Sequence, residues 1–201
     1  MPLNIAITDY GVGNLYSIRR SLEKCGANVE IVTDMSRLED AECIVFPGVG
    51  AFDKTMEKLL PYRQSICDRL KDGTPALGIC IGMQILFEGS DEGKSPGLGL
   101  YSGRVTKMKG EVIPHMGWNQ VDTVDGILSG IDDRNFYFVH SFFGSPSEDG
   151  IAIGTTEYEG ISFPSLFRKY NTYGTQFHPE KSSASGLQVL RNFISFAEGQ
   201  L

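Results

Sequence analysis

The stretch that decides the fold of this chain is residues 74–88, TPALGICIGMQILFE. It predicts a short apolar strand that ends at Cys80 and passes directly into a helix, because apolar residues repeat at helical spacing after the cysteine: Met83, Leu86 and Phe87. With no polar loop between strand and helix, the turn has to be sharp, and Gly78 and Gly82 leave room for it. This spacing is typical of a nucleophile elbow with cysteine in place of serine, which exposes the central side chain at the edge of a sheet.

Cys80 is therefore the first candidate for a reactive group. Free N–H groups in the first turn of a helix favour the thiolate, which is the nucleophilic form of cysteine. The alternative is a buried structural cysteine between two packing glycines, because free cysteines are among the most buried residues in proteins. The flanking glycines favour the nucleophile.

The first half of the chain alternates predicted strands with predicted helices. We expect strands at residues 4–8, 29–33, 42–46 and before Cys80, and helices at residues 15–25, 51–56 and 62–71. This alternation predicts a parallel sheet with helices on both faces, whose functional residues gather at the carboxyl ends of the strands. Cys80 and the turn PGVG at residues 47–50 both lie at such ends. Gly11 and Gly13 suggest a dinucleotide fingerprint, but the third glycine of that motif is absent.

The second half of the chain is mostly predicted strand. We expect strands at residues 98–108, 115–123, 135–143, 151–157, 161–170 and 173–177. Glu159-Gly160 is typical of a hairpin turn, and residues 185–197 form a closing amphipathic helix. No linker or repeat divides the sequence, so we expect one domain over residues 1–201.

The composition excludes several classes of protein. A formal net charge of −7 argues against a nucleic-acid partner, which needs a basic surface. The N-terminal residues lack the pattern of a secretion signal, and no apolar run is long enough for a membrane span. Four cysteines without CxxC spacing fit reduced thiols in the cytoplasm and give no metal site. The sequence therefore favours a cytoplasmic enzyme.

A cysteine nucleophile needs a general base, and the chain holds three histidines. His178 is followed by Pro179, which disfavours helix, and residues two apart on an extended segment point the same way. Glu180 can then orient the imidazole of His178, as the third member of a catalytic triad does. The alternative for His178 is a surface loop residue. His115 and His140 have no carboxylate at a useful spacing, and we expect structural or interfacial roles for them.

An acyl-transfer site also needs hydrogen-bond donors for the developing oxyanion. The N–H of Ile81 is one donor by the geometry of the elbow. The glycine-rich turn at residues 47–50 fits the need for the second donor. The alternative for that turn is a plain strand-to-helix connection.

The combination of GICIGMQ at residues 78–84 with His178-Pro179-Glu180 resembles the class I, triad-type glutamine amidotransferases. Within that family, four stretches resemble the glutaminase subunits of imidazole glycerol phosphate synthases: PGVGAF at 47–52, PHMGWN at 114–119, YFVHS at 137–141 and QFHPEKS at 176–182. The resemblance covers essentially the whole chain. It implies an α/β, flavodoxin-like three-layer sandwich with a central mixed, mostly parallel sheet and an antiparallel C-terminal extension.

The resemblance also implies roles for individual residues. Cys80 would attack the carboxamide of glutamine to form a glutamyl thioester, while His178 would move the protons and Glu180 would hold His178. Val49 and Ile81 match the oxyanion donors. The residues that match substrate-binding positions are Gly50, Gln84, Glu92, Ser141 and Phe142. Residues 141–144 depart from the family pattern, because the second aromatic residue there is more often polar or small.

A partner is implied as well, a (β/α)₈ cyclase subunit that forms a heterodimer with this chain and receives its ammonia; no cofactor is implied. The residues that match the docking face are Met116, Trp118, Asn119, Tyr137 and Lys181. From composition alone, Trp118 belongs either to an interface or to the core. Two other hypotheses stay open: the same triad serving another synthase, for pyridoxal phosphate or anthranilate, and a non-catalytic relative whose elbow cysteine is a redox sensor or chaperone site.

Overall fold

The computed structural model describes residues 1–11, 15–48 and 50–201. Strands and helices alternate along the first half of the chain, as the sequence predicts. The elements are β1 (Asn4–Thr8), α1 (Tyr16–Lys24), β2 (Asn28–Val32), β3 (Cys43–Phe46), α2 (Phe52–Leu59), α3 (Arg63–Lys71), β4 (Ala76–Ile79) and α4 (Ile81–Gln84).

The second half is rich in strands and ends in one long helix. Its elements are β5 (Gly103–Lys107), β6 (His115–Gln120), β7 (Asn135–His140), β8 (Phe142–Pro146), β9 (Ala152–Tyr158), β10 (Ile161–Lys169), β11 (Thr172–Thr175) and α5 (Ser183–Glu198). The predicted hairpin turn is confirmed: Glu159 and Gly160 both have positive φ, as a tight turn between the antiparallel strands β9 and β10 requires.

Three predicted elements are wrong in extent. The predicted strand at residues 135–143 is two strands, because β7 pairs with β6 while β8 pairs with β5, and the chain changes partner at Ser141. The predicted helix after Cys80 is a single turn, α4. It stops because the carbonyls of Ile85 and Leu86 accept hydrogen bonds from Leu98 and Tyr101 instead of from a next helical turn. The predicted strand at residues 98–108 accordingly begins only at β5.

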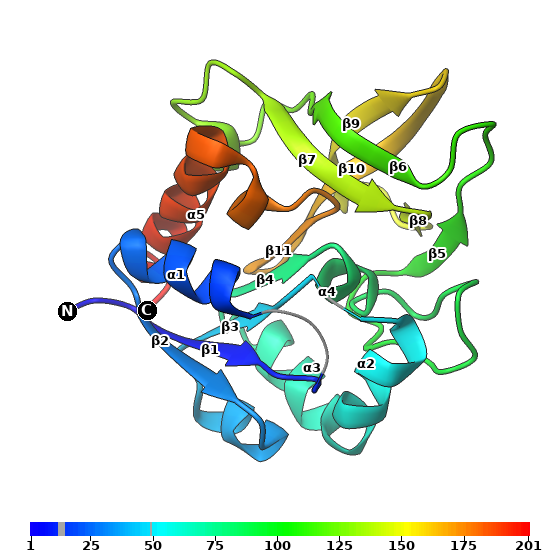
Figure 1. The fold of residues 1–201 in the computed structure, drawn as a ribbon. Helices are drawn as coiled ribbons and strands as arrows, with labels where there is room; N and C mark the ends of the chain where they lie inside the picture. The colour runs from blue at the N-terminus through cyan, green and yellow to red at the C-terminus, as the bar shows by residue number, and fades with distance from the viewer. Residues whose placement is uncertain (12–14, 49) are drawn as a thin grey trace.

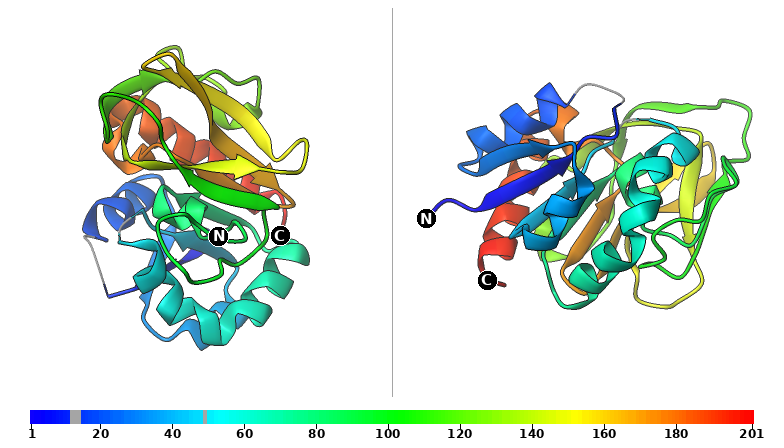
Figure 2. Two further views of the ribbon diagram at one scale, coloured as in Figure 1. Left: turned by 90° about the vertical axis from the view of Figure 1, so that its right-hand side faces the viewer. Right: turned by 90° about the horizontal axis from the view of Figure 1, so that it is seen from below.

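The central sheet has seven strands in the order β2-β1-β3-β4-β11-β10-β9 (Figure 1). The first five strands are parallel, and β10 and β9 extend the sheet in antiparallel pairing. The predicted fold class, a mixed and mostly parallel α/β sheet with an antiparallel extension, is confirmed. The two-stranded sheets β5-β8 and β6-β7 lie beside the antiparallel end, so that Figure 2 shows a helix-rich half next to a strand-rich half.

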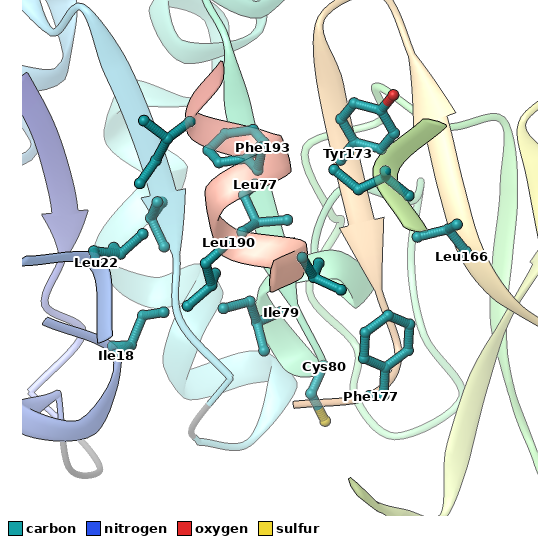
Figure 3. Close-up of a cluster of buried hydrophobic side chains, with 14 of the residues drawn as sticks. Ile18, Leu22, Leu77, Ile79, Cys80, Leu166, Tyr173, Phe177, Leu190 and Phe193 are labelled. Atoms are coloured by element: carbon teal, nitrogen blue, oxygen red, sulfur yellow. The ribbon is translucent and has the colours of Figure 1, made fainter. Parts of the chain in front are cut away.

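Helices cover both faces of the sheet because the central strands are apolar on both sides. In β3, Cys43 and Val45 pack in one core with residues of α1 and α5, whereas Ile44 and Phe46 pack in a second core with residues of α2 and α3. Alternate residues of a strand face opposite sides, so one fully buried strand supplies both layers. Figure 3 shows the first of these cores and, at the end of β4 beyond Ile79, the side chain of Cys80.

The turn after β4 is backbone-strained, as the elbow pattern predicts. Cys80 has φ +49° and ψ −109°, a backbone conformation that residues other than glycine rarely adopt. Its N–H donates to the Thr175 carbonyl at 2.7 Å, which ties the turn to the end of β11. A β-carbon on Gly82 would overlap the carbonyl oxygen of Phe46. Only glycine therefore lets the turn pass this closely over β3.

Gly82→Ala should lower the free energy of unfolding by about 3 kcal/mol, because a methyl group driven into a backbone carbonyl forces the turn to move. The control is Gly126→Ala, since among the described residues, its own chain neighbours apart, no atom lies within 4 Å of the β-carbon position of Gly126. This change should stay within about 0.5 kcal/mol of the parent chain. Urea unfolding of both variants measures the difference, and equal stability of the two would contradict the close packing at the elbow.

Candidate active site

The structure brings His178 and Glu180 together just after β11. Nδ1 of His178 lies 2.8 Å from Oε1 of Glu180, and both side chains are buried. The sequence predicted an extended segment here, and this prediction is wrong after His178. Residues Pro179–Lys181 form one 3₁₀ turn. The turn is anchored to β7, because the His178 N–H donates to the Tyr137 carbonyl at 2.9 Å and the Tyr137 N–H donates to Ser182 Oγ at 2.9 Å.

The environment of His178 favours a positively charged imidazolium. Burial by itself lowers the pKa of His178, but the charges of Cys80 and Glu180 outweigh it and raise that pKa to about 10. With Nδ1 bonded to Glu180, the proton on Nε2 is the one that remains to be given up. Nε2 is buried and makes no hydrogen bond to any residue that the structure describes. This nitrogen is free to exchange a proton with a bound molecule.

The Cys80 sulfur lies near two separate parts of the chain, β7 and the segment that follows β11. It is 3.9 Å from the Val139 carbonyl oxygen and 3.6 Å from Nε2 of Gln176, and Cys80 is only 8% exposed. His178 is close enough to act on it electrostatically. The end of β3 adjoins His178, because a β-carbon on Gly48 would come within 2.8 Å of Cε1 of that residue. The predicted triad therefore converges on one point.

Of the predicted oxyanion donors, one is described. Ile81 directly follows Cys80 as the first residue of α4 and is buried. Val49 lies outside the residues that the structure describes. Gly50, which follows it, has φ +120° and is exposed immediately before the N-terminus of α2.

The predicted substrate-binding residues fall into two groups. Nε2 of Gln84 donates to the Phe142 carbonyl at 2.9 Å, which places α4 against the start of β8. Ser141 precedes this contact and is half-buried. Glu92 lies elsewhere, where its Oε2 accepts the N–H of Phe52 at 3.2 Å, close in sequence to Gly50. The structure thus joins Gln84 with residues 141–142 and Glu92 with the start of α2.

The predicted docking residues mostly share one face of β6 and β7. Met116 and Trp118 are 60% and 54% exposed, so Trp118 is not a core residue. Trp118 is opposite Tyr137 in the register, with ring centroids 6.2 Å apart, and Lys181 Nζ is 5.9 Å from the Tyr137 ring centroid. Asn119 differs, because its side chain turns to the other side of the strand and donates to the Glu157 carbonyl at 2.8 Å.

Sequence reasoning missed Gln176, whose amide nitrogen lies next to the Cys80 sulfur. The signal was present, because Gln176 lies two residues before His178 at the same spacing that paired His178 with Glu180.

His115 and His140 are buried and hydrogen-bonded to each other, with Nδ1 of His115 3.1 Å from Nε2 of His140. They contribute a polar network behind the site, which no local spacing in the sequence indicates.

Within residues 1–11, 15–48 and 50–201, no cluster of three or more His, Cys, Asp or Glu side chains could hold a metal ion. Nor does any described helix have the length and apolar character that crossing a membrane requires.

Comparison with known proteins finds the same family along the whole chain. Residues 6–196 match the family described as glutamine amidotransferase class-I. "Imidazole glycerol phosphate synthase subunit HisH" of Methanothermobacter thermautotrophicus is 45% identical, with 94% of this chain and 97% of that protein covered. The protein of the same name from Halobacterium salinarum is 43% identical, with coverage of 98% and 95%.

Solved structures show the same fold. One described as a glutamine amidotransferase has a TM-score of 0.77 at 16% identity and covers 96% of this chain and 98% of its own. The structure of PurLQS from Thermotoga maritima has a TM-score of 0.75 at 17% identity, with 99% of both chains covered. At these identities the likeness concerns the fold alone.

Cys80→Ser should lower the pKa of His178. The negative charge of the sulfur stabilises the imidazolium of His178, whereas burial destabilises the imidazolium. The substitution removes the charge and leaves the burial unchanged. The NMR signals of the three histidine Cε1 protons, followed from about pH 6 to 11, measure this change.

His115 and His140 are internal controls, because burial lowers their pKa values to about 4 and about 3, and neither should titrate in this range. A His178 signal that titrates near its ordinary pKa in the parent chain, or at the same pH with and without the sulfur, would contradict the charge interaction.

Proposed function

The chain belongs to the class I glutamine amidotransferases, and from this we propose that it is the glutaminase subunit of an imidazole glycerol phosphate synthase. It hydrolyses glutamine and passes ammonia to a separate cyclase subunit in histidine biosynthesis. The observation that carries the chemistry is the convergence of Cys80 with the buried His178–Glu180 pair. Relatives that match over nearly their full length support the choice of synthase.

The proposed reaction proceeds in two steps at Cys80. The thiolate attacks the carboxamide carbon of glutamine, and the resulting tetrahedral intermediate expels ammonia after Nε2 of His178 protonates the amide nitrogen. This leaves a glutamyl thioester. His178 then takes a proton from water, which attacks the thioester and releases glutamate with the sulfur restored. Glu180 holds the imidazole through Nδ1 in both steps, and the 2.8 Å contact supports that role.

The surroundings of Cys80 support the remaining assignments. The N–H of Ile81 is one proposed oxyanion donor, and Val49 is proposed for the other. Gln84, Ser141 and Phe142 would line the glutamine site on the α4 side. Gly50 and Glu92 would line it at the start of α2, where the contact of Glu92 with Phe52 keeps that carboxylate near Gly50.

The proposed partner is the (β/α)₈ cyclase subunit, docked on the face formed by Met116, Trp118, Tyr137 and Lys181. Exposed aromatic and methionine side chains are enriched in protein interfaces, and two of these residues are more than half exposed. Asn119 would support this face from behind. The net charge of −7 gives no support to a nucleic-acid partner. The four free thiols support a reducing compartment, for which we propose the cytoplasm.

Cys80→Ala should reduce glutamate formation from glutamine by at least about 10³-fold, because among the described cysteines only Cys80 contacts the His178 segment. The assay uses this chain mixed with the cyclase subunit and its nucleotide ligand, which should raise the activity of the parent chain. The control is Cys25→Ala, which removes a half-buried thiol that bonds the Leu187 carbonyl. Wild-type activity in Cys80→Ala would exclude Cys80 as the nucleophile, and stimulation only by an unrelated synthase would change the partner.

Trp118→Ala should weaken binding of the cyclase subunit by about 2 kcal/mol, roughly thirtyfold in Kd, as expected for a central aromatic residue of an interface. Titration calorimetry measures the affinity. The matched control is Tyr170→Ala, which removes an exposed aromatic ring just before β11, at the opposite edge of the sheet from Cys80. Equal affinities for both variants would place the docking face elsewhere.

A further inference from the structure

A buried amide lies beside the nucleophile. Gln176 is fully buried, and its Nε2 atom lies 3.6 Å from the Cys80 sulfur. Burying an amide is costly unless its polar atoms are hydrogen-bonded. The oxygen of Gln176 satisfies this condition, because Oε1 lies 3.3 Å from Nε2 of Gln84.

One backbone carbonyl sets the orientation of both amides. The oxygen of Phe142 accepts a hydrogen bond from Nε2 of Gln84 at 2.9 Å. Because a carbonyl can only accept, Gln84 has to present its NH₂ group on this side, where the group also meets Oε1 of Gln176. The NH₂ group of Gln176 is then left to face the sulfur. A flipped Gln176 would oppose two NH₂ groups and direct an oxygen lone pair at Cys80.

The same carbonyl is held by a second chain of hydrogen bonds. Nδ1 of His140 lies 2.8 Å from the Phe142 oxygen, so Nδ1 carries the proton and Nε2 accepts. Nδ1 of His115 must then donate to Nε2 of His140 at 3.1 Å, and Nδ2 of Asn119 donates to Nε2 of His115 at 3.5 Å. Protonating either imidazole would set two N–H groups against each other. Each hydrogen bond in this series therefore has its donor on the β6 side and its acceptor on the Phe142 side.

Packing keeps the rings of His115 and His140 in place and keeps both imidazoles neutral. The His115 ring stacks between Phe138 and Tyr158, with centroid distances of 4.7 Å and 3.9 Å. Burial lowers the pKa values of His115 and His140 to about 4 and about 3, so neither is charged at neutral pH. The imidazolium of His178 is a charged neighbour of Cys80, and Glu180 contacts the Nδ1 atom of that imidazolium.

We propose that Gln176 is a catalytic group whose amide N–H stabilises negative charge on the Cys80 sulfur, and that His140 is a positioning residue that fixes this amide through Phe142 and Gln84. The inference rests on the proposed glutaminase function. In that reaction the sulfur is negative twice: before it attacks the carboxamide carbon, and when the C–S bond of the thioester breaks and its electron pair returns to sulfur. A hydrogen bond to the charged form favours it at both stages.

Alkylation of Cys80 by iodoacetamide tests the amide without glutamine or the partner. In the full chain, Gln176→Glu replaces the donor with an acceptor, and Gln176→Met removes it without adding charge. Both changes should slow alkylation at neutral pH about tenfold and move the midpoint of its pH profile upward. Peptide mass spectrometry resolves Cys80 from the other thiols. The control is Gln200→Glu, an exposed position beyond α5, which should alkylate at the parent rate.

The role of His140 is tested by a rescue in the glutaminase assay with the cyclase. His140→Leu removes the donor to Phe142 and should lower kcat about tenfold with little change in KM. His140→Asn keeps an N–H donor and should recover most of the loss. Equal kcat values in these two variants would overturn the positioning role.

The outcomes separate the two proposals. If Cys80 alkylates at the parent rate in both Gln176 variants, the catalytic role of Gln176 is wrong whatever the glutaminase assay gives. If the Gln176 variants alkylate slowly but the parent chain hydrolyses no glutamine even with the cyclase, the proposed function is wrong and the interaction of Gln176 with the sulfur stands.

Discussion

The parallel pairing of β4 with β11 is the constraint on which the site depends. The register sets Gly174 opposite Gly78 and Thr175 opposite Ile79, and the Cys80 N–H then donates to the Thr175 carbonyl at 2.7 Å. Parallel strands end at the same edge of a sheet, so the nucleophile and the segment that carries His178 leave the sheet side by side. A slip of one residue would turn every side chain of β11 to the opposite face and separate them.

The packing around this pair of strands holds a strained turn in place. Positive φ at a residue other than glycine costs of order 1–3 kcal/mol of conformational strain. Cys80 has this conformation at the end of a fully buried strand. The turn is held on two sides. Gly82 packs against the Phe46 carbonyl, and the Cys80 N–H donates to the Thr175 carbonyl. The sulfur is thereby held at the carboxyl end of β4, at the margin of the first core.

Three buried histidines differ in charge because their neighbours differ. His178 faces the charges of Cys80 and Glu180, which outweigh its burial and raise its pKa to about 10. His115 and His140 face each other, aromatic rings and a carbonyl, so burial prevails and lowers their pKa values to about 4 and about 3. One imidazole is suited to moving a proton, whereas the other two form a neutral scaffold whose hydrogen bonds keep one direction.

The sequence by itself determined the features that local patterns encode: the alternation of strands and helices, the elbow at Cys80, and the pairing of His178 with Glu180 two residues apart. Only the tertiary structure decided the length of α4, the division of residues 135–143 between two sheets, and the contact of Gln176 with the sulfur. The physical reason is that a hydrogen bond is satisfied by whichever partner lies within reach. For Ile85, Phe142 and Gln176 that partner comes from a distant part of the chain.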